Sequence, residues 1–155
     1  MFKKSIKRKW LVDTRKIYNL EQHKYDNIEI SYLSQRYDSL TVSVLSVNGS
    51  DFKLFLKDGG MKSRNCISYN ISEEEYIISK KLAGNKIIKK KRYYVPSSFN
   101  STDTIYVDVF EKHGFVLAEF ESDNEILLDI LQDEDWFIKE VTDDINFYGQ
   151  EFVYN

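Results

Sequence analysis

Alternation of apolar and polar residues dominates this chain and predicts short β-strands through most of its length. A pattern of period two places successive side chains on opposite faces of a sheet. Asn48-Gly49 and Asp58-Gly59-Gly60 each separate two alternating segments, which is typical of hairpin turns. The alternating segments predict eight strands, at residues 5–12, 27–34, 40–47, 52–57, 62–71, 87–95, 104–110 and 115–121.

Two segments interrupt this period and carry the signals of helix starts. Ser72 followed by Glu75 matches a capping box, in which each side chain bonds the other residue's amide. Ser122 and Glu125 repeat the pattern and predict a second helix that ends near residue 131. The acidic and aromatic segment 133–155 is expected to dock on the domain.

These elements predict one α+β domain over residues 1–155, since no repeat or linker interrupts the pattern. An antiparallel sheet of this size usually closes or curls to protect its edges. We therefore expect an eight-stranded antiparallel β-barrel with helices packed outside. Two arrangements agree equally well with the alternation: an open sheet whose polar face meets water, or a barrel whose polar faces enclose a charged lumen.

The composition excludes several classes of protein. A chain that is 42% hydrophobic and 15% aromatic is not disordered as a whole. No stretch approaches the roughly 20 apolar residues of a membrane helix, and the basic start lacks the apolar segment of a signal peptide. With Cys66 as the single cysteine, no internal disulfide can form. We expect a cytoplasmic protein with no membrane partner.

Charge is unevenly distributed along the chain. Residues 1–98 hold 20 of the 22 basic residues and 10 of the 25 acidic ones, so the rest of the chain is strongly acidic. This asymmetry fits either a solvated surface or a basic surface or cavity that receives anionic ligands. The formal net charge of −3 disfavours long nucleic acid as a partner.

Residues 5–12 read SIKRKWLV and residues 88–95 read IKKKRYYV. The first segment resembles the E-x-E-R-K-F-L-V motif of the CYTH superfamily, and the second resembles its I-x-K-x-R-Y-x-V motif. Shorter matches follow in the same order along the chain, at residues 31–33, 55–57, 63–64, 106–110, 117–121 and 140–144 with 147–148. The superfamily, the triphosphate tunnel metalloenzymes, includes class IV adenylyl cyclases and thiamine triphosphatases.

The resemblance implies a tunnel of eight strands in which basic side chains bind phosphates and carboxylates hold Mg²⁺ or Mn²⁺. Five basic residues match basic positions of the family motifs, and Lys7 stands where the family has a carboxylate but could neutralise phosphate charge. The expected ligand-binding residues are therefore Lys7, Lys9, Lys57, Arg64, Lys90 and Arg92. The candidate metal ligands are Asp108, Glu119 and Glu121. The alternative is that these three carboxylates pair with Lys9, Lys90 and Arg92 inside the barrel, because buried charges need partners.

The sequence departs from the family pattern at positions where the resemblance places its chemistry. The first-strand E-x-E becomes Ser5 and Lys7, and the third-strand R-x-R becomes Thr41 and Ser43. The carboxylates of the fifth strand become Cys66, Ser68 and Asn70. Lys7 would repel a divalent ion, since like unit charges about 4 Å apart repel by roughly 4 kcal/mol at an effective dielectric near 20.

We therefore expect a CYTH-like tunnel that binds a small polyanion without standard metal-dependent hydrolysis. The ligand would be a nucleotide, a nucleotide signal or a polyphosphate, and Tyr32, Tyr94 or Tyr106 could stack on a base. One alternative is a divergent triphosphatase that uses a divalent metal on tripolyphosphate or on a nucleoside or thiamine triphosphate. Another is an interaction module that keeps only the fold and presents its acidic tail to a partner.

Overall fold

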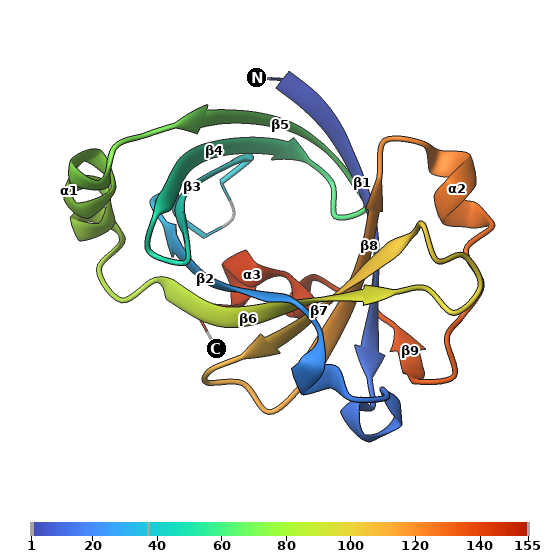
Figure 1. Cartoon of the computed structure of the whole chain (residues 1–155). Coiled ribbons are helices and arrows are strands. Elements are labelled where there is room, and N and C mark those ends of the chain that lie inside the picture. The colour runs from blue at the N-terminus through green and yellow to red at the C-terminus, as the bar shows by residue number, and fades with distance from the viewer. Residues whose placement is uncertain (1, 37, 155) are drawn as a thin grey trace.

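A closed antiparallel sheet forms the body of the protein in the computed structural model, which describes residues 2–36 and 38–154 (Figure 1). Its eight barrel strands are β1 (Phe2–Val12), β2 (Tyr25–Tyr32), β3 (Leu40–Val47), β4 (Asp51–Gly59), β5 (Ser63–Asn70), β6 (Ile87–Pro96), β7 (Thr104–Phe110) and β8 (Val116–Ser122). The strands follow the order β5-β4-β3-β2-β6-β7-β8-β1, and a β5–β1 pairing closes the barrel. The predicted eight-stranded antiparallel β-barrel is confirmed.

Strand β1 is long enough to pair with three neighbours. Its first part pairs with β5, from Phe2 to Ile6, and its second part pairs with β8, from Ile6 to Leu11. The far end also pairs with a ninth strand, β9 (Phe137–Glu140), which the sequence pattern did not predict. The acidic tail is thereby tied to the outside of the barrel.

The turn between β3 and β4 forms as the sequence predicts. Asn48 and Gly49 have φ angles of 55° and 67°, in the left-handed region that these two residue types tolerate best. The Asn48 side chain also accepts a hydrogen bond from the amide of Asn27 at 2.8 Å. This contact ties the hairpin turn to the start of β2.

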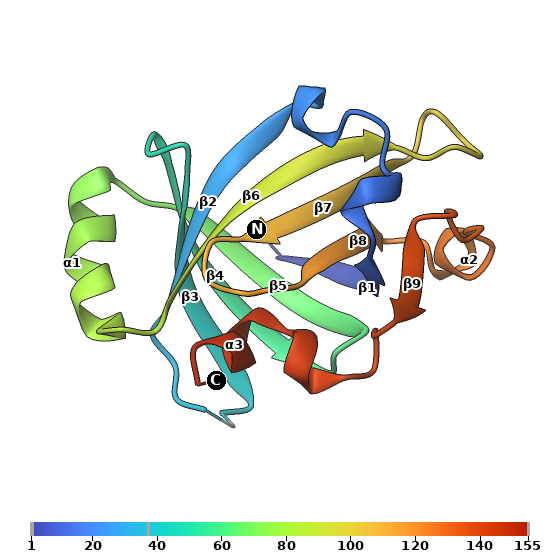
Figure 2. The ribbon, with the colours of Figure 1, turned by 90° about the horizontal axis from the view of Figure 1, so that it is seen from below.

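Two helices flank the barrel on opposite sides (Figures 1 and 2). Helix α1 (Glu73–Ala83) begins with the predicted capping box between Ser72 and Glu75. Helix α2 (Glu125–Asp129) is shorter than predicted, and its N-cap is Asn124 rather than Ser122. The capping-box prediction was wrong there because the Asn124 side chain accepts from the Ile126 amide and starts the helix two residues later.

The remaining helical segments are single turns. Three are 3₁₀-helices, η1 (Thr14–Lys16), η2 (Leu20–Gln22) and η3 (Ile145–Phe147). The last is α3 (Gly149–Phe152), which lies across the middle of the barrel in the view of Figure 1. None of the described helices is long and apolar enough to cross a membrane.

The apolar faces of several strands point outward, which resolves the two arrangements left open by the alternation. Trp10, Val107 and Ala118 are buried on the outer face with Leu128 of α2 and Trp136 of the tail. The basic residues of the same strands therefore face the lumen. A second apolar cluster joins Tyr32, Ile88, Phe110, Leu117, Val141 and Phe152, and it brings the C-terminal segment against the barrel interior.

Candidate functional site

A cavity of about 270 Å³ occupies the barrel interior. Seven basic and three acidic side chains of the described residues line it, so its wall carries a formal excess of four positive charges. The basic side chains are Lys3, Lys7, Lys9, Lys57, Arg64, Lys90 and Arg92, and the acidic ones are Asp108, Glu119 and Glu121. All six predicted ligand-binding residues and all three candidate metal ligands therefore face one space.

Strand periodicity explains how residues distant in sequence meet here. Lys7 and Lys9 are two residues apart on β1, and Lys90 and Arg92 are two apart on β6, so each pair shares the inner face. Most residues that stand at the family's charged positions also line the cavity: Ser5, Lys7, Thr41, Ser43 and Cys66. Ser68 and Asn70 of β5 are not among its lining residues.

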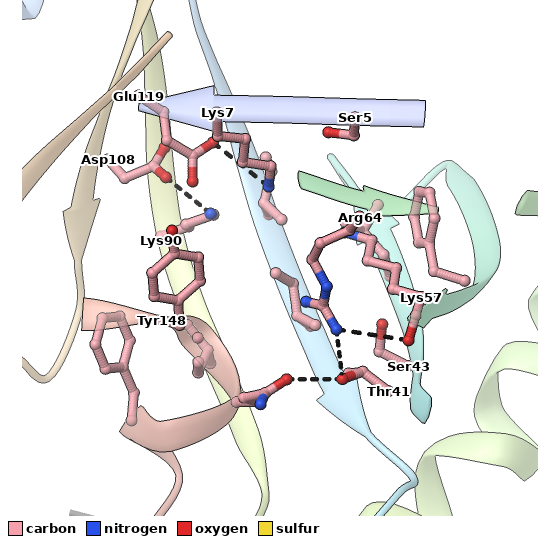
Figure 3. A pocket seen from close by; sticks show the side chains of 18 of the residues that line it. Ser5, Lys7, Thr41, Ser43, Lys57, Arg64, Lys90, Asp108, Glu119 and Tyr148 are labelled. Atoms are coloured by element: carbon pink, nitrogen blue, oxygen red, sulfur yellow. Dashed lines mark hydrogen bonds and ion pairs between the residues drawn. The ribbon is translucent and has the colours of Figure 1, made fainter. Parts of the chain in front are cut away.

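Asp108 is buried at one side of the cavity and binds two cations. Its Oδ2 accepts from the Lys90 ammonium at 2.8 Å (Figure 3). Arg92 donates to both of its oxygens at 2.8 Å. Burial opposes the charge on Asp108, but Arg92 and Lys90 outweigh it and hold the pKa of this carboxyl below its usual value. Burial lowers the pKa of Lys90, and the cation of Arg92 lowers it further.

Glu119 lies beside Asp108 and is surrounded by cations. Its carboxylate is 3.3 Å from the Lys9 Nζ, 3.8 Å from the Lys7 Nζ and 3.2 Å from the Arg92 Nη2. Burial opposes its ionisation, yet these positive charges hold the pKa of Glu119 well below its usual value. Burial lowers the pKa of Lys9 to about 8 even though Glu119 is its ion-pair partner.

Glu121 lies nearer to solvent than the other two carboxylates. Its Oε1 accepts from the Ser5 hydroxyl at 2.7 Å and is 3.7 Å from the ammonium of the exposed Lys3. Burial opposes its charge, but Lys7 and the Ser5 hydroxyl lower its pKa.

A second group of side chains, on β3, β4 and β5, is cationic without a matching carboxylate. The Arg64 Nη2 donates to the Thr41 hydroxyl at 2.8 Å and lies 3.5 Å from the carbonyl oxygen of Lys57 (Figure 3). Within residues 2–36 and 38–154, neither Arg64 nor Lys57 has a carboxylate oxygen within the 4.0 Å of an ion pair. In that same range the Arg64 Nε is buried without a hydrogen-bond partner.

Burial and like charge act together on this cationic group. Part of the Lys57 side chain is accessible through the cavity, but protein atoms surround its ammonium. Burial lowers the pKa of Lys57 to about 7, and the cation of Lys7 contributes to that shift. Burial also lowers the pKa of Arg64. An anion that entered the cavity would relieve both costs.

The C-terminal segment supplies lining residues that the strand pattern did not identify. The Gln150 Oε1 accepts from the Thr41 hydroxyl at 2.7 Å, which links α3 to Arg64 through one side chain. The Lys9 Nζ donates to the Phe147 carbonyl at 3.1 Å and lies 3.8 Å above the centre of the Tyr148 ring. A single turn without strand periodicity gave no signal that would have placed these residues inside a barrel.

The candidate base-stacking tyrosines fall in two groups. Tyr32 lines the cavity, where burial raises its pKa. Tyr94 and Tyr106 lie outside the cavity lining and pack edge to face with their ring centres 5.5 Å apart. Tyr106 also stacks under the Arg92 guanidinium at 4.7 Å. Only Tyr32 of the three is placed to contact a ligand in the cavity.

The donor set does not fit a divalent cation in this ion-paired arrangement. Mg²⁺ and Mn²⁺ need several oxygen ligands, but the oxygens of Asp108 and Glu119 already face four ammonium or guanidinium groups. No group of three or more His, Cys, Asp or Glu side chains in the described part of the chain is arranged to hold a metal ion. The expectation that Asp108, Glu119 and Glu121 bind a metal stays a prediction.

No protein-family model and no curated protein matches this chain, but several solved structures share its fold. The inorganic triphosphatase NE1496 has a TM-score of 0.69 and 19% identity, over 97% of this chain and 95% of that one. A candidate adenylate cyclase from Bacillus halodurans has a TM-score of 0.60 and 14% identity, over 86% and 96% of the two chains.

A third structure is the Hippeastrum protein HpAC1, whose description gives it a dominant triphosphatase activity. Its TM-score is 0.52 at 10% identity, over 83% of each chain. At such low identities these likenesses establish the fold of this chain, and its ligand has to be argued from its own residues.

Proposed function

We propose that this chain, which has the CYTH-type triphosphate tunnel fold that its sequence predicts, binds a compact phosphorylated anion in its basic lumen. The observation that carries the proposal is the cationic group of Lys57 and Arg64, which lies in the cavity and has no carboxylate partner among the residues that the structure describes. Buried cations without counter-charges are costly, and a bound phosphate would supply the missing charge.

The other cations of the lumen form ion pairs with carboxylates. The two sides of the cavity therefore differ: one is balanced by carboxylates, and the other holds Arg64 and Lys57. Asp108 and Glu119 balance Lys9, Lys90 and Arg92 and keep them in place in the empty protein. Arg64 lies on the other side of the cavity, where its Nη2 donates to the Thr41 hydroxyl and, among the described residues, its Nε has no hydrogen-bond partner, so its guanidinium keeps donor capacity for an anion. Lys7 carries a fixed positive charge at the position where the family pattern has a carboxylate.

The size of the cavity favours a small ligand. Its 270 Å³ lies below the roughly 300–1,000 Å³ typical of sites that enclose drug-sized molecules. A diphosphate or triphosphate group fits this volume, whereas the base of a nucleotide would extend beyond it. Inorganic tripolyphosphate is therefore the first ligand to test.

Isothermal titration calorimetry with tripolyphosphate in excess EDTA tests the proposal. We expect binding without a divalent ion, and we expect Arg64→Gln to weaken it about 10- to 100-fold, since a charge-assisted hydrogen bond contributes roughly 1.5–3 kcal/mol. The matched control is Lys89→Gln, because the Lys89 ammonium is largely exposed and pairs with Glu29 outside the lumen. Absence of binding, or equal affinity in Arg64→Gln and wild type, would contradict the proposal.

Triphosphate hydrolysis with a divalent metal is the second candidate function. It is favoured by two structural neighbours, an inorganic triphosphatase and a protein with dominant triphosphatase activity. Phosphate release from tripolyphosphate with Mg²⁺ or Mn²⁺, abolished by Glu119→Gln, would establish it. Binding in EDTA without turnover in either metal would leave the binding function alone.

A further inference from the structure

We propose that Lys57 is a covalent attachment site, an amine that condenses with the carbonyl group of a small phosphorylated aldehyde held in the tunnel. The inference rests on the proposed anion binding and adds to it a reactive group and a class of ligand. Its basis is the contrast between Lys57 and the other lysines of the lumen.

The ammonium groups of the other lumenal lysines contact carboxylate or carbonyl oxygens. The Lys90 ammonium bonds Asp108 at 2.8 Å, and the Lys7 ammonium is 3.8 Å from Glu119. Lys9 contacts Glu119, the Phe147 carbonyl and the face of Tyr148. For Lys9 and Lys90 the carboxylate partners oppose the effect of burial on the pKa and so favour the ammonium form, which has no lone pair for attack on a carbonyl carbon.

Lys57 has a different environment. The charged and titratable groups that face it are Lys7 on β1, Arg64 and Cys66 on β5, and Glu119 on β8. Glu119 already pairs with Lys7, Lys9 and Arg92. These three cations offset its negative charge, so Glu119 does little to stabilise the ammonium form of Lys57. Lys7 and Arg64 are cations, and like charge combined with burial favours the neutral amine.

The resulting pKa of about 7 leaves roughly half of Lys57 as free amine at neutral pH. For a lysine with the ordinary pKa near 10.4 that fraction is about a thousandfold smaller. A lowered pKa in a desolvated, cation-rich pocket is one of the recognised ways in which proteins activate lysine for imine formation.

Arg64, the centre of the proposed anion site, lines the same cavity as Lys57, and its charge contributes to the lowered pKa of Lys57. The Arg64 Nη2 lies 3.5 Å from the Lys57 backbone oxygen, and its Nε has no hydrogen-bond partner in the described part of the chain. A phosphate on Arg64 would hold an aldehyde arm of the same molecule close to the Lys57 side chain. Proximity of this kind replaces a bimolecular encounter by an intramolecular one.

The condensation balances without an oxidant or reductant. The lone pair of the Lys57 nitrogen forms a C–N bond to the carbonyl carbon, and the C=O π electrons move to oxygen, which takes the proton that the nitrogen releases. The carbinolamine then loses its hydroxyl group together with the second proton of the nitrogen as water, which gives the imine. Inorganic polyphosphate has no carbonyl group, so it would bind the same lumen only non-covalently and would favour protonation of Lys57.

Pyridoxal 5′-phosphate, followed by borohydride reduction and peptide mapping, tests the inference. We expect Lys57 to be modified at least about tenfold faster than the outer-face residue Lys89, given its much larger fraction of free amine. Pyridoxal without the phosphate should react about tenfold more slowly at Lys57, which corresponds to one lost charge-assisted contact. Lys57→Arg should lose the tunnel adduct, and Lys89→Arg should keep it.

Adducts spread evenly over surface lysines, or located on Lys7 or Lys9 instead of Lys57, would overturn the inference. Titration with tripolyphosphate distinguishes failure of this inference from failure of the proposed function. If tripolyphosphate binds by calorimetry but Lys57 forms no adduct, the inference fails and the proposed function stands. If the Lys57 adduct forms and tripolyphosphate neither binds nor protects it, the proposed function fails.

Discussion

Lys57 and Glu119 face the same lumen, and burial acts against the charge of both side chains. The two side chains nevertheless differ in how far they keep their charge, because the charged groups around them differ. Glu119 has three cations within 4 Å, and these hold its pKa well below the usual value, whereas Lys57 has cations nearby and no ion-pair partner in the described part of the chain. At the residue scale the structure therefore separates side chains that stabilise the barrel from side chains that cost stability until a ligand arrives.

Replacing Lys57 by Met should stabilise the ligand-free protein. The unfolded chain keeps the Lys57 proton up to a pKa near 10.4, while the folded chain releases it near pH 7. Between these values the unfolded state binds more protons, so wild-type stability rises with pH in this window. Lys57→Met should flatten that rise and increase the free energy of unfolding at pH 7 by about 1 kcal/mol, or roughly 2–4 °C in Tm.

Urea denaturation at pH 7 and pH 9 measures both effects on Lys57→Met. Lys89→Met is the control, because the Lys89 ammonium is mostly exposed and its loss should change neither the stability nor the pH slope. A loss of stability in Lys57→Met at pH 7 would mean that the ammonium has an acceptor in the folded state.

Replacing Glu119 by Gln should have the opposite effect. The change leaves Lys7, Lys9 and Arg92 without the carboxylate that they share, and removing one partner of a buried ion pair typically costs about 3–5 kcal/mol. The depressed pKa of Glu119 means that its stabilisation is present above its unfolded pKa and is lost as pH falls through its folded pKa. Urea denaturation of Glu119→Gln, with the exposed Glu21→Gln as control, measures this cost; a change below about 1 kcal/mol would contradict it.

At the scale of elements, the alternating strands could be predicted and the C-terminal segment could not. Alternation placed Lys57 and Arg64 on the polar faces of their strands, because a period of two leaves only two choices for each strand, and the resemblance to the tunnel family implied that these faces point inward. The tail that brings Tyr148 and Gln150 to the lumen has no such period. Its position depends on long-range contacts such as the hydrogen bond from Thr41 to Gln150, which local sequence does not encode.

Gly149 tests how closely α3 is packed against the barrel. A Cβ atom at this position would collide with the Tyr32 hydroxyl and contact Ile88 at 3.5 Å. Gly149→Ala should therefore displace α3 and lower the free energy of unfolding by about 1–3 kcal/mol, as overpacking usually does. Gly114→Ala is the matched control, since nothing lies within 4 Å of the added Cβ there. Equal stability of the two variants in thermal denaturation would show that α3 is not closely packed against Tyr32 and Ile88.

At the scale of the whole molecule, basic side chains outnumber acidic ones in the lumen although the C-terminal part of the chain is acidic. The sequence showed the uneven charge, and the family resemblance implied the inward direction of the lumenal lysines and arginines. Neither could predict that cations would surround Asp108 and Glu119 while Arg64 has no carboxylate partner among the described residues, because that depends on distances between side chains of different strands. The charge excess of the cavity is therefore a property of the closed barrel.

The affinity for an anion should depend on pH in a defined direction. A bound phosphate favours the ammonium form of Lys57, whose pKa in the empty tunnel is about 7. The affinity for tripolyphosphate should therefore fall as pH rises from 6.5 to 8.5, with about one proton taken up on binding at the upper end. Calorimetry in buffers of different ionisation enthalpy measures this uptake. Lys57→Arg should bind without it, and an unchanged uptake in that variant would assign the proton to another group.

Diffraction from crystals soaked in tungstate, a phosphate-like oxyanion with strong anomalous scattering, tests the central claim most directly. The account predicts an anomalous peak inside the barrel within hydrogen-bonding distance of the Arg64 guanidinium and the Lys57 ammonium, and no such peak in Arg64→Gln crystals. Tungstate bound only to lysines on the outer surface, with none in the lumen of the wild-type protein, would contradict it.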